Sequence, residues 1–96
     1  MEKICSQLEQ LLGFPDTRCD LASEQRAELD LGDGTIVEKW IYTAEPGSRI
    51  PANLYRPASV PERIPAVVMT CGHGDSKNLA HMQYIAWTYA RAGLAS

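Results

Sequence analysis

Several features typical of membrane, nucleic-acid-binding and secreted proteins are absent from this sequence. Its longest apolar run, Ile64 to Cys71, is far shorter than the ~20 residues that span a bilayer. The net charge is −3, and Lys and Arg are scattered singly, which argues against a surface for nucleic acid or anionic lipid. The amino end carries acidic residues where a secretory signal would be apolar. We therefore expect a cytoplasmic protein that binds neither nucleic acid nor membrane.

Metal and disulfide signatures are missing as well. Cys5, Cys19 and Cys71 are an odd number of cysteines at wide spacings, without a C-x-x-C pair. Free thiols in a reducing compartment are the simplest interpretation. No cluster of carboxylates or cysteines accompanies His73 and His81 at a ligand spacing, so we interpret both histidines as solvent-facing or loop-packing. The sequence predicts no metal site.

The composition is that of one globular unit. The chain has 96 residues, of which 45% are apolar and 22% charged, and this balance is typical of a folded domain. A chain of this length buries only somewhat above ~60% of its unfolded surface. We expect a modest core.

The first 25 residues are expected to form a helix and an arm. Four apolar residues recur at helical spacing, and a glycine and a proline follow them: Ile4, Leu8, Leu11, Leu12, Gly13 and Pro15. Such a stripe normally marks contact with the rest of the domain, so we expect the helix to pack on it; a helix that binds a partner is the alternative. Residues 15–25 are polar and turn-prone, which is typical of a connecting arm.

Residues 26–57 predict antiparallel strands. Apolar residues alternate with acidic ones from Ala27 to Leu31, the triplet Gly32 to Gly34 follows, and Ile36 to Thr43 is rich in β-branched and aromatic residues. This order is typical of a hairpin. After a turn signal at Glu45 to Ser48, Ile50 to Pro57 reads as another strand, in which Pro51 suits an edge or a strand start.

The pattern changes to α/β after residue 63. Ile64 to Cys71 has almost no polar side chain, which is typical of a strand covered on both faces. A glycine loop follows, then one apolar helix face ended by Gly93: Leu79, Met82, Ile85, Ala86, Tyr89 and Ala90. Leu94 to Ser96 resembles the start of a further strand. A strand, loop, helix and strand in this order join parallel neighbours, so we expect the sequence to stop inside a βαβ unit.

The second half resembles the opening of α/β-hydrolases of the acetyl xylan esterase and dienelactone hydrolase-like group. The resemblance rests on Ile50 to Pro57, on Ile64 to Met69, on Cys71 to Lys77 and on Ala90 to Leu94. It covers roughly residues 35–96. It implies an α/β fold whose hydrolase domain begins at residue 26 and is incomplete at residue 96.

The resemblance also implies a site. In this fold, one oxyanion-hole N–H comes from the loop after this strand. Within the loop Gly72 to Asp75, that donor is His73, with Gly74 as second choice. The implied activity is hydrolysis of a small acyl or acetyl ester through a serine, without a cofactor. However, residues 1–96 contain no G-x-S-x-G nucleophile motif, so we expect no activity from them alone, and an exposed strand edge that favours self-association.

Other interpretations of the same residues are weaker. A Cys71–His73 dyad would need both side chains within hydrogen-bond reach and a third group to orient the base, and a separation of two residues across a glycine turn gives no reason to expect this. We therefore expect Cys71 to be packed at the strand end. The loop Gly72 to Lys77 lacks the G-x-x-x-x-G-K-[ST] spacing of a phosphate cradle. Ser76 and Ser96 are the remaining candidate nucleophiles. Ser76, however, suits an N-cap or first-turn role. Four aromatic residues fall at packing positions rather than on a sugar platform: Trp40, Tyr42, Trp87 and Tyr89. A non-catalytic interaction module derived from this fold is the alternative function.

Overall fold

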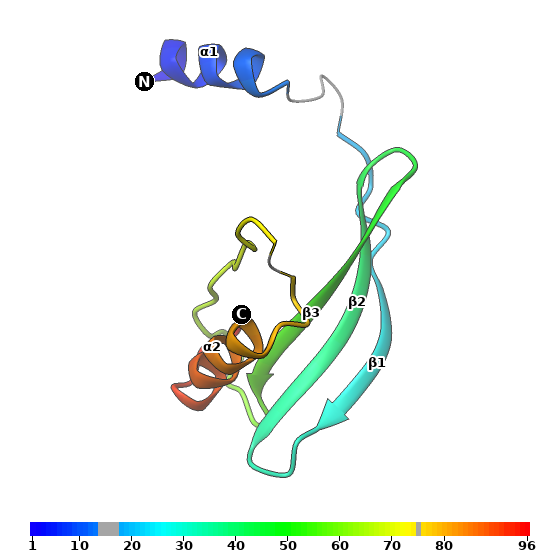
Figure 1. The fold of residues 1–96 in the computed structure, drawn as a ribbon, viewed down its shortest axis with the longest axis vertical. Helices are drawn as coiled ribbons and strands as arrows, with labels where there is room; N and C mark the ends of the chain where they lie inside the picture. Colours follow the sequence, from blue (N-terminus) through cyan, green and yellow to red (C-terminus); the bar gives the residue numbers. More distant parts are fainter. Residues whose placement is uncertain (14–17, 75) are drawn as a thin grey trace.

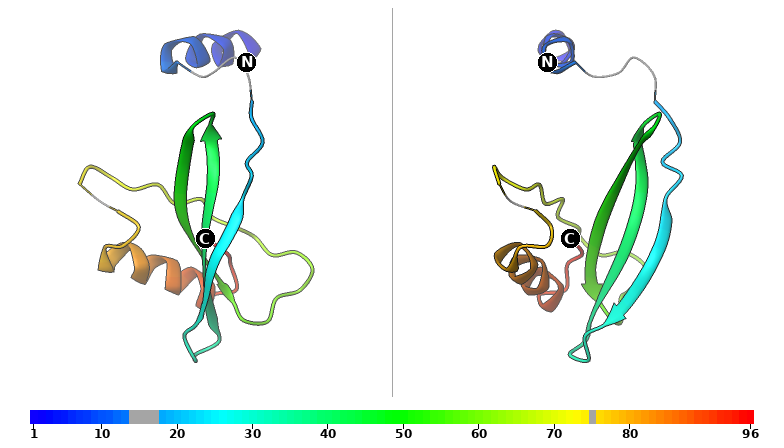
Figure 2. Two further views of the ribbon diagram at one scale, coloured as in Figure 1. Left: turned by 90° about the vertical axis from the view of Figure 1, so that its right-hand side faces the viewer. Right: turned by 45° about the vertical axis from the view of Figure 1, so that its right-hand side comes forward.

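The computed structural model describes residues 1–13, 18–74 and 76–96 and contains two helices and a three-stranded sheet. In chain order these are α1 (Glu2–Leu12), β1 (Glu24–Asp30), β2 (Thr35–Glu45), β3 (Ser48–Pro57) and α2 (Ala80–Arg91). The sheet is antiparallel in the order β1-β2-β3, and α2 covers one of its faces (Figures 1 and 2). The mixed α/β character that the sequence predicts is confirmed at this level.

Helix α1 has the predicted extent but not the predicted packing. It ends at Gly13, whose φ of 70° and ψ of 36° are the left-handed conformation that glycine tolerates. The expected second terminator, Pro15, lies outside the described residues. None of the residues of α1 is buried, and Leu11 is 83% exposed. The helix lies apart from the sheet and from α2 in every view (Figures 1 and 2), so the expectation that its apolar stripe packs on the domain is wrong.

The two predicted strand connections are confirmed. β1 and β2 form a hairpin across Gly32 and Gly34, whose φ values of 77° and 89° are left-handed. The Asp30 and Asp33 side chains accept hydrogen bonds from the backbone two residues further on, at 2.8 and 3.0 Å, and thereby close the turn. β2 and β3 pair from Thr35 with Pro57 to Glu45 with Ser48.

The outer edge of β3 carries two prolines. Tyr55 exchanges both backbone hydrogen bonds with Ser96, at 2.8 and 3.0 Å, so its N–H points away from β2. Backbone direction alternates along a strand, so Pro51, Asn53 and Pro57 face the same outer edge. Pro51 therefore costs the β2–β3 ladder no hydrogen bond, which agrees with its predicted edge character.

The segment from Ile64 to Cys71 is not the interior strand that its composition predicts. It makes one isolated parallel bridge, between Ala66 and Ala95, and Val68 is 90% exposed. Only Met69 packs against the core. An apolar segment becomes a buried strand when other elements cover both of its faces, and the described part of the chain supplies no such double cover.

The core lies between α2 and the sheet. Val37 and Tyr55 on the sheet meet Ala86 and Ala90, one turn apart on α2, and Trp87 packs at their side. The two alanines have short side chains, so the helix can approach the strands closely. Helix α2 ends as predicted, with Gly93 at a φ of 91°, but Leu79 and Ile85 of the predicted apolar face are exposed. The core is as modest as the length suggests.

Candidate functional site

The glycine loop lies at the carboxyl end of the 64–71 segment and leads toward α2 (Figure 1). His73 and Gly74 form a turn in which Gly74 has a φ of 75°, and both residues are exposed. Within the described part of the chain, neither N–H donates to another backbone group. Asp75, the last residue of the predicted loop, lies outside the described residues. The turn is therefore open to solvent rather than sealed under side chains.

Cys71 and His81 are the other candidate catalytic side chains among the described residues of this region. Cys71 is an exposed free cysteine, so its expected packing at the strand end is wrong. His81 lies in the first turn of α2. Among the described residues, no group of three His, Cys, Asp or Glu side chains is placed to hold a metal ion.

Ser76 belongs to a turn before the helix and not to its first turn. Its Oγ accepts the N–H of Asn78 at 3.3 Å, its carbonyl accepts the N–H of Leu79 at 3.1 Å, and Leu79 is the N-cap of α2. The expected N-cap or first-turn role of Ser76 is therefore wrong, because the N-cap, Leu79, lies three residues further along the chain. Lys77 next to it donates to the side-chain oxygen of Asn78 at 3.3 Å. The Ser76 hydroxyl has a structural partner in this turn.

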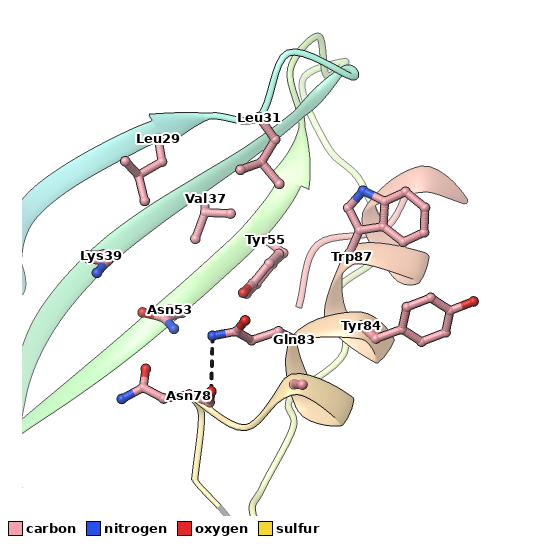
Figure 3. A pocket seen from close by; sticks show the side chains of 11 residues that line it. Leu29, Leu31, Val37, Lys39, Asn53, Tyr55, Asn78, Gln83, Tyr84 and Trp87 are labelled. Carbon is pink, nitrogen blue, oxygen red and sulfur yellow. Dashed lines mark hydrogen bonds between the residues drawn. The ribbon is translucent and has the colours of Figure 1, made fainter.

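A pocket of about 450 Å³ lies between the sheet and the amino-terminal half of α2 (Figure 3). Its sheet wall carries Leu29, Leu31, Val37, Lys39, Asn53 and Tyr55, and its helix wall carries Asn78, Ala80, Gln83, Tyr84 and Trp87. This volume is within the range of small-molecule sites. Gln83 donates to the carbonyl of Asn78 at 3.3 Å, which fixes the start of the helix at the pocket rim.

The pocket lining suits binding more than hydrolysis. Among the described residues, its lining includes no Ser, Cys, His, Asp or Glu side chain. Burial raises the pKa of the Tyr55 phenol, which therefore stays a hydrogen-bond donor at neutral pH. The side-chain oxygen of Asn53 is buried and has no hydrogen-bond partner among the described residues. The Asn53 amide and the Tyr55 phenol on the sheet wall can hydrogen-bond to a ligand and orient it.

Comparisons of the chain with models of protein families, with curated proteins and with solved structures found no match.

The opposite face of the sheet holds a charged cluster that the sequence analysis did not single out. Arg56 donates to Glu38 and, at 3.1 Å, to Glu28, and the indole N–H of Trp40 donates to Glu38 at 2.8 Å. Glu28 and Glu38 are direct cross-strand neighbours, so Arg56 neutralises a like-charge pair. Burial opposes ionisation of Glu38, but the hydrogen bonds from Arg56 and Trp40 outweigh it and lower the pKa below its usual value.

The alternation of side chains along a strand could have shown from the sequence which residues share the pocket face of the sheet and which share the face of the charged cluster. Along β2 the odd-numbered residues Val37 and Lys39 face the pocket, and the even-numbered Glu38 and Trp40 face the charged cluster. The register between strands is what brings Asn53 beside Lys39 and Glu28 beside Glu38. Of the four aromatic residues expected at packing positions, none is fully buried: Trp40, Tyr42, Trp87 and Tyr89.

The described helices include none that is both long and apolar enough to cross a membrane.

Proposed function

We propose that these 96 residues are the amino-terminal part of a serine ester hydrolase and supply one side of its oxyanion hole. The observation that carries the proposal is the isolated parallel bridge between Ala66 and Ala95, because it sets the segment before the exposed glycine turn parallel to the segment after α2. In open α/β sheets, ligands meet the loops at the carboxyl ends of parallel strands. The resemblance of residues 35–96 to the acetyl xylan esterase group supports the same function.

The chemistry rests on backbone hydrogens. His73 is the first candidate donor and Gly74 the second, and their exposed turn leaves both N–H groups accessible. An oxyanion forms when a serine attacks an ester carbonyl, and each well-placed donor stabilises the transition state by about 2.7 to 4 kcal/mol. The substrate class is a small acyl or acetyl ester. The serine, the acid and the histidine lie outside residues 1–96, so these residues alone give no turnover.

One observation favours the alternative, a non-catalytic interaction module. The apolar stripe of α1 is exposed, and Ile4, Leu8 and Leu12 are 57%, 49% and 66% accessible to solvent. Exposed apolar patches often mark contact surfaces. The coding sequence beyond Ser96 discriminates between the two functions: a G-x-S-x-G segment there supports the hydrolase, and a stop codon directly after Ser96 supports the module.

The oxyanion hole is tested by removing one backbone N–H of the loop at a time, with a control for the loss of the imidazole. In the complete hydrolase, replacing the Gly74 amide by an ester should lower kcat for p-nitrophenyl acetate if Gly74 donates, and His73→Pro should lower it about 100- to 1000-fold if His73 donates. His73→Ala keeps the N–H and is the matched control, with little change expected. An equal loss in His73→Ala would contradict the proposal, because the imidazole would then be the active group.

The absence of a nucleophile from these residues has its own test. A fluorophosphonate probe reacts with activated serines, so it should label none of the serines in residues 1–96 of the complete protein. Mass spectrometry of the tryptic peptides locates the adduct. Stoichiometric labelling of Ser76 or Ser96 would place the nucleophile inside this stretch and overturn the assignment.

A further inference from the structure

The sheet wall of the pocket changes from polar to apolar along the strands. Lys39 and Asn53 are direct neighbours across β2 and β3, and Val37 and Tyr55 are the next pair on the same face. Leu29 on β1 pairs with Val37 and extends this second, apolar row. A polar end and an apolar end therefore lie next to each other within one lining.

The charge of the polar end is not neutralised. Among the described residues of the lining, Lys39 is the only charged side chain. Its direct neighbours on the two flanking strands are Ala27 and Asn53, so the register places no carboxylate opposite its ammonium group. Within the described residues Lys39 makes no ion pair, since those of the sheet are all formed by arginines. A cation that lacks a counter-charge in the wall of a cavity favours an anionic ligand.

The groups around Lys39 are hydrogen-bond donors. The side-chain oxygen of Asn53 is buried, and its nitrogen points toward Gln83 on the opposite wall (Figure 3). The amide nitrogen offers two donors and the phenol of Tyr55 offers one, and a carboxylate has only acceptors. The amino end of α2 also lines the pocket and has no acidic residue in its first turn, so the helix dipole adds to the positive potential.

The apolar end of the pocket is partly uncovered and partly fixed. Leu29 and Leu31 are 46% and 48% exposed, so a ligand that covers them removes apolar surface from water. On the helix wall, the indole N–H of Trp87 is bound to the side chain of Asp33. An aromatic ring that is already held in place can pack against a ligand without losing further side-chain freedom.

We propose that this pocket binds a small organic carboxylate with an aromatic tail. The carboxylate lies against Lys39 and Asn53, and the tail lies between Leu29 on the sheet wall and Trp87 on the helix wall. The described lining includes no residue of the glycine loop, and the proposal does not depend on ester hydrolysis.

The first experiment asks whether the pocket recognises the charge of the ligand. The probe is hydrocinnamate, and the matched control ligand is hydrocinnamamide, which has nearly the same shape but no charge. Isothermal titration calorimetry with the full chain should show saturable binding of hydrocinnamate, about fivefold or more tighter than that of the amide, because Lys39 is exposed and its ion pair is partly screened. Equal affinities for the two ligands, or no saturable binding of hydrocinnamate, would overturn the proposal.

The second experiment asks whether Lys39 is the group that recognises the charge. Lys39→Met removes the ammonium group, and Lys3→Met makes the same charge change on α1, outside the pocket. Lys39→Met should weaken hydrocinnamate about fivefold and leave the affinity for hydrocinnamamide unchanged, whereas Lys3→Met should change neither. An equal loss in the two variants would assign the effect to the net charge of the chain and contradict the proposed site.

The two tryptophans locate the bound ligand. Trp87 lines the pocket, and Trp40 lies on the opposite face of the sheet with its indole N–H bound to Glu38. In NMR spectra recorded during the titration, the indole N–H signal of Trp87 should shift with hydrocinnamate concentration, and that of Trp40 should stay in place. A larger shift at Trp40 would place the ligand outside the pocket and contradict the proposal.

Discussion

The indole N–H of Trp87 donates a hydrogen bond of 2.7 Å to the Oδ2 of Asp33, 54 residues earlier in the chain. One turn further along α2, Arg91 donates to the carbonyl of Asp33 at 2.9 Å, and its guanidinium lies 5.5 Å from the centre of the Trp87 ring. These contacts attach the hairpin turn to the helix. They also lower the pKa of Asp33, to which the hydrogen bond from Trp87 contributes most.

This attachment predicts a specific coupling between two substitutions. Trp87→Phe removes the indole N–H and keeps an aromatic ring, and Asp33→Asn removes the charge, so each should lower Tm. Because both act on one hydrogen bond, the double variant should lose less than the sum of the two losses. Thermal unfolding of the four proteins by circular dichroism measures this. Strict additivity would show that the bond does not stabilise the fold.

Arg56→Met should destabilise the protein by about 2 to 3 kcal/mol. Removal of the guanidinium leaves Glu38, which is only 7% exposed, without its charged partner and opposite Glu28. Methionine keeps most of the apolar stem of the arginine side chain, so the loss of stability measures the effect of removing the charged group. Urea unfolding measures the change, and Glu28→Gln combined with Glu38→Gln in the Arg56→Met background should restore part of the stability. No recovery would mean that Arg56 acts through packing.

Stability should fall as the solution becomes acidic, with Glu38 as one source. Its pKa is lowered on folding from a reference of 4.5, so the ionised form is favoured in the native state. The corresponding stabilisation is complete above the unfolded pKa and is lost as the pH falls below about 4.5 and through the folded pKa. Urea midpoints between pH 7 and pH 3 should therefore decline less steeply for Glu38→Gln. If the urea midpoints of the two proteins declined in parallel, Glu38 would not be a source of the pH dependence of stability.

Helix α1 should be dispensable for the stability of the remaining fold. None of its residues is buried, so deletion of residues 1–12 should change the free energy of unfolding by less than about 0.5 kcal/mol. Leu8→Asp should be tolerated for the same reason, whereas Ala86→Asp places a charge in the core and should unfold the protein. Denaturant melts of the three variants provide the measurement. A large loss on deletion would mean that the apolar stripe packs on the domain.

Local sequence patterns predicted the helices, strands and turns better than they predicted which residues are buried. Turn chemistry at Gly32 to Gly34 and at Gly13 has its causes in adjacent residues, and those elements form as expected. Burial depends on distant segments, and there the prediction failed for the α1 stripe, for Val68 and for Cys71. The Trp87–Asp33 bond and the Arg56 cluster depend on the tertiary arrangement of segments, which periodicity alone does not give. The donor roles of His73 and Gly74 stay a prediction.

The two outward-facing prolines of β3 set a limit on how any strand can pair with that edge. Between Pro51 and Pro57, only Asn53 and Tyr55 present an N–H on the outer side, and Ser96 already occupies Tyr55. A neighbouring strand that slipped by two residues toward Pro57 would place the Ser96 carbonyl opposite a proline nitrogen and lose a hydrogen bond. The two prolines therefore limit this stretch of the edge to two N–H donors, which makes it a poor template for the open-ended stacking of chains that leads to aggregation.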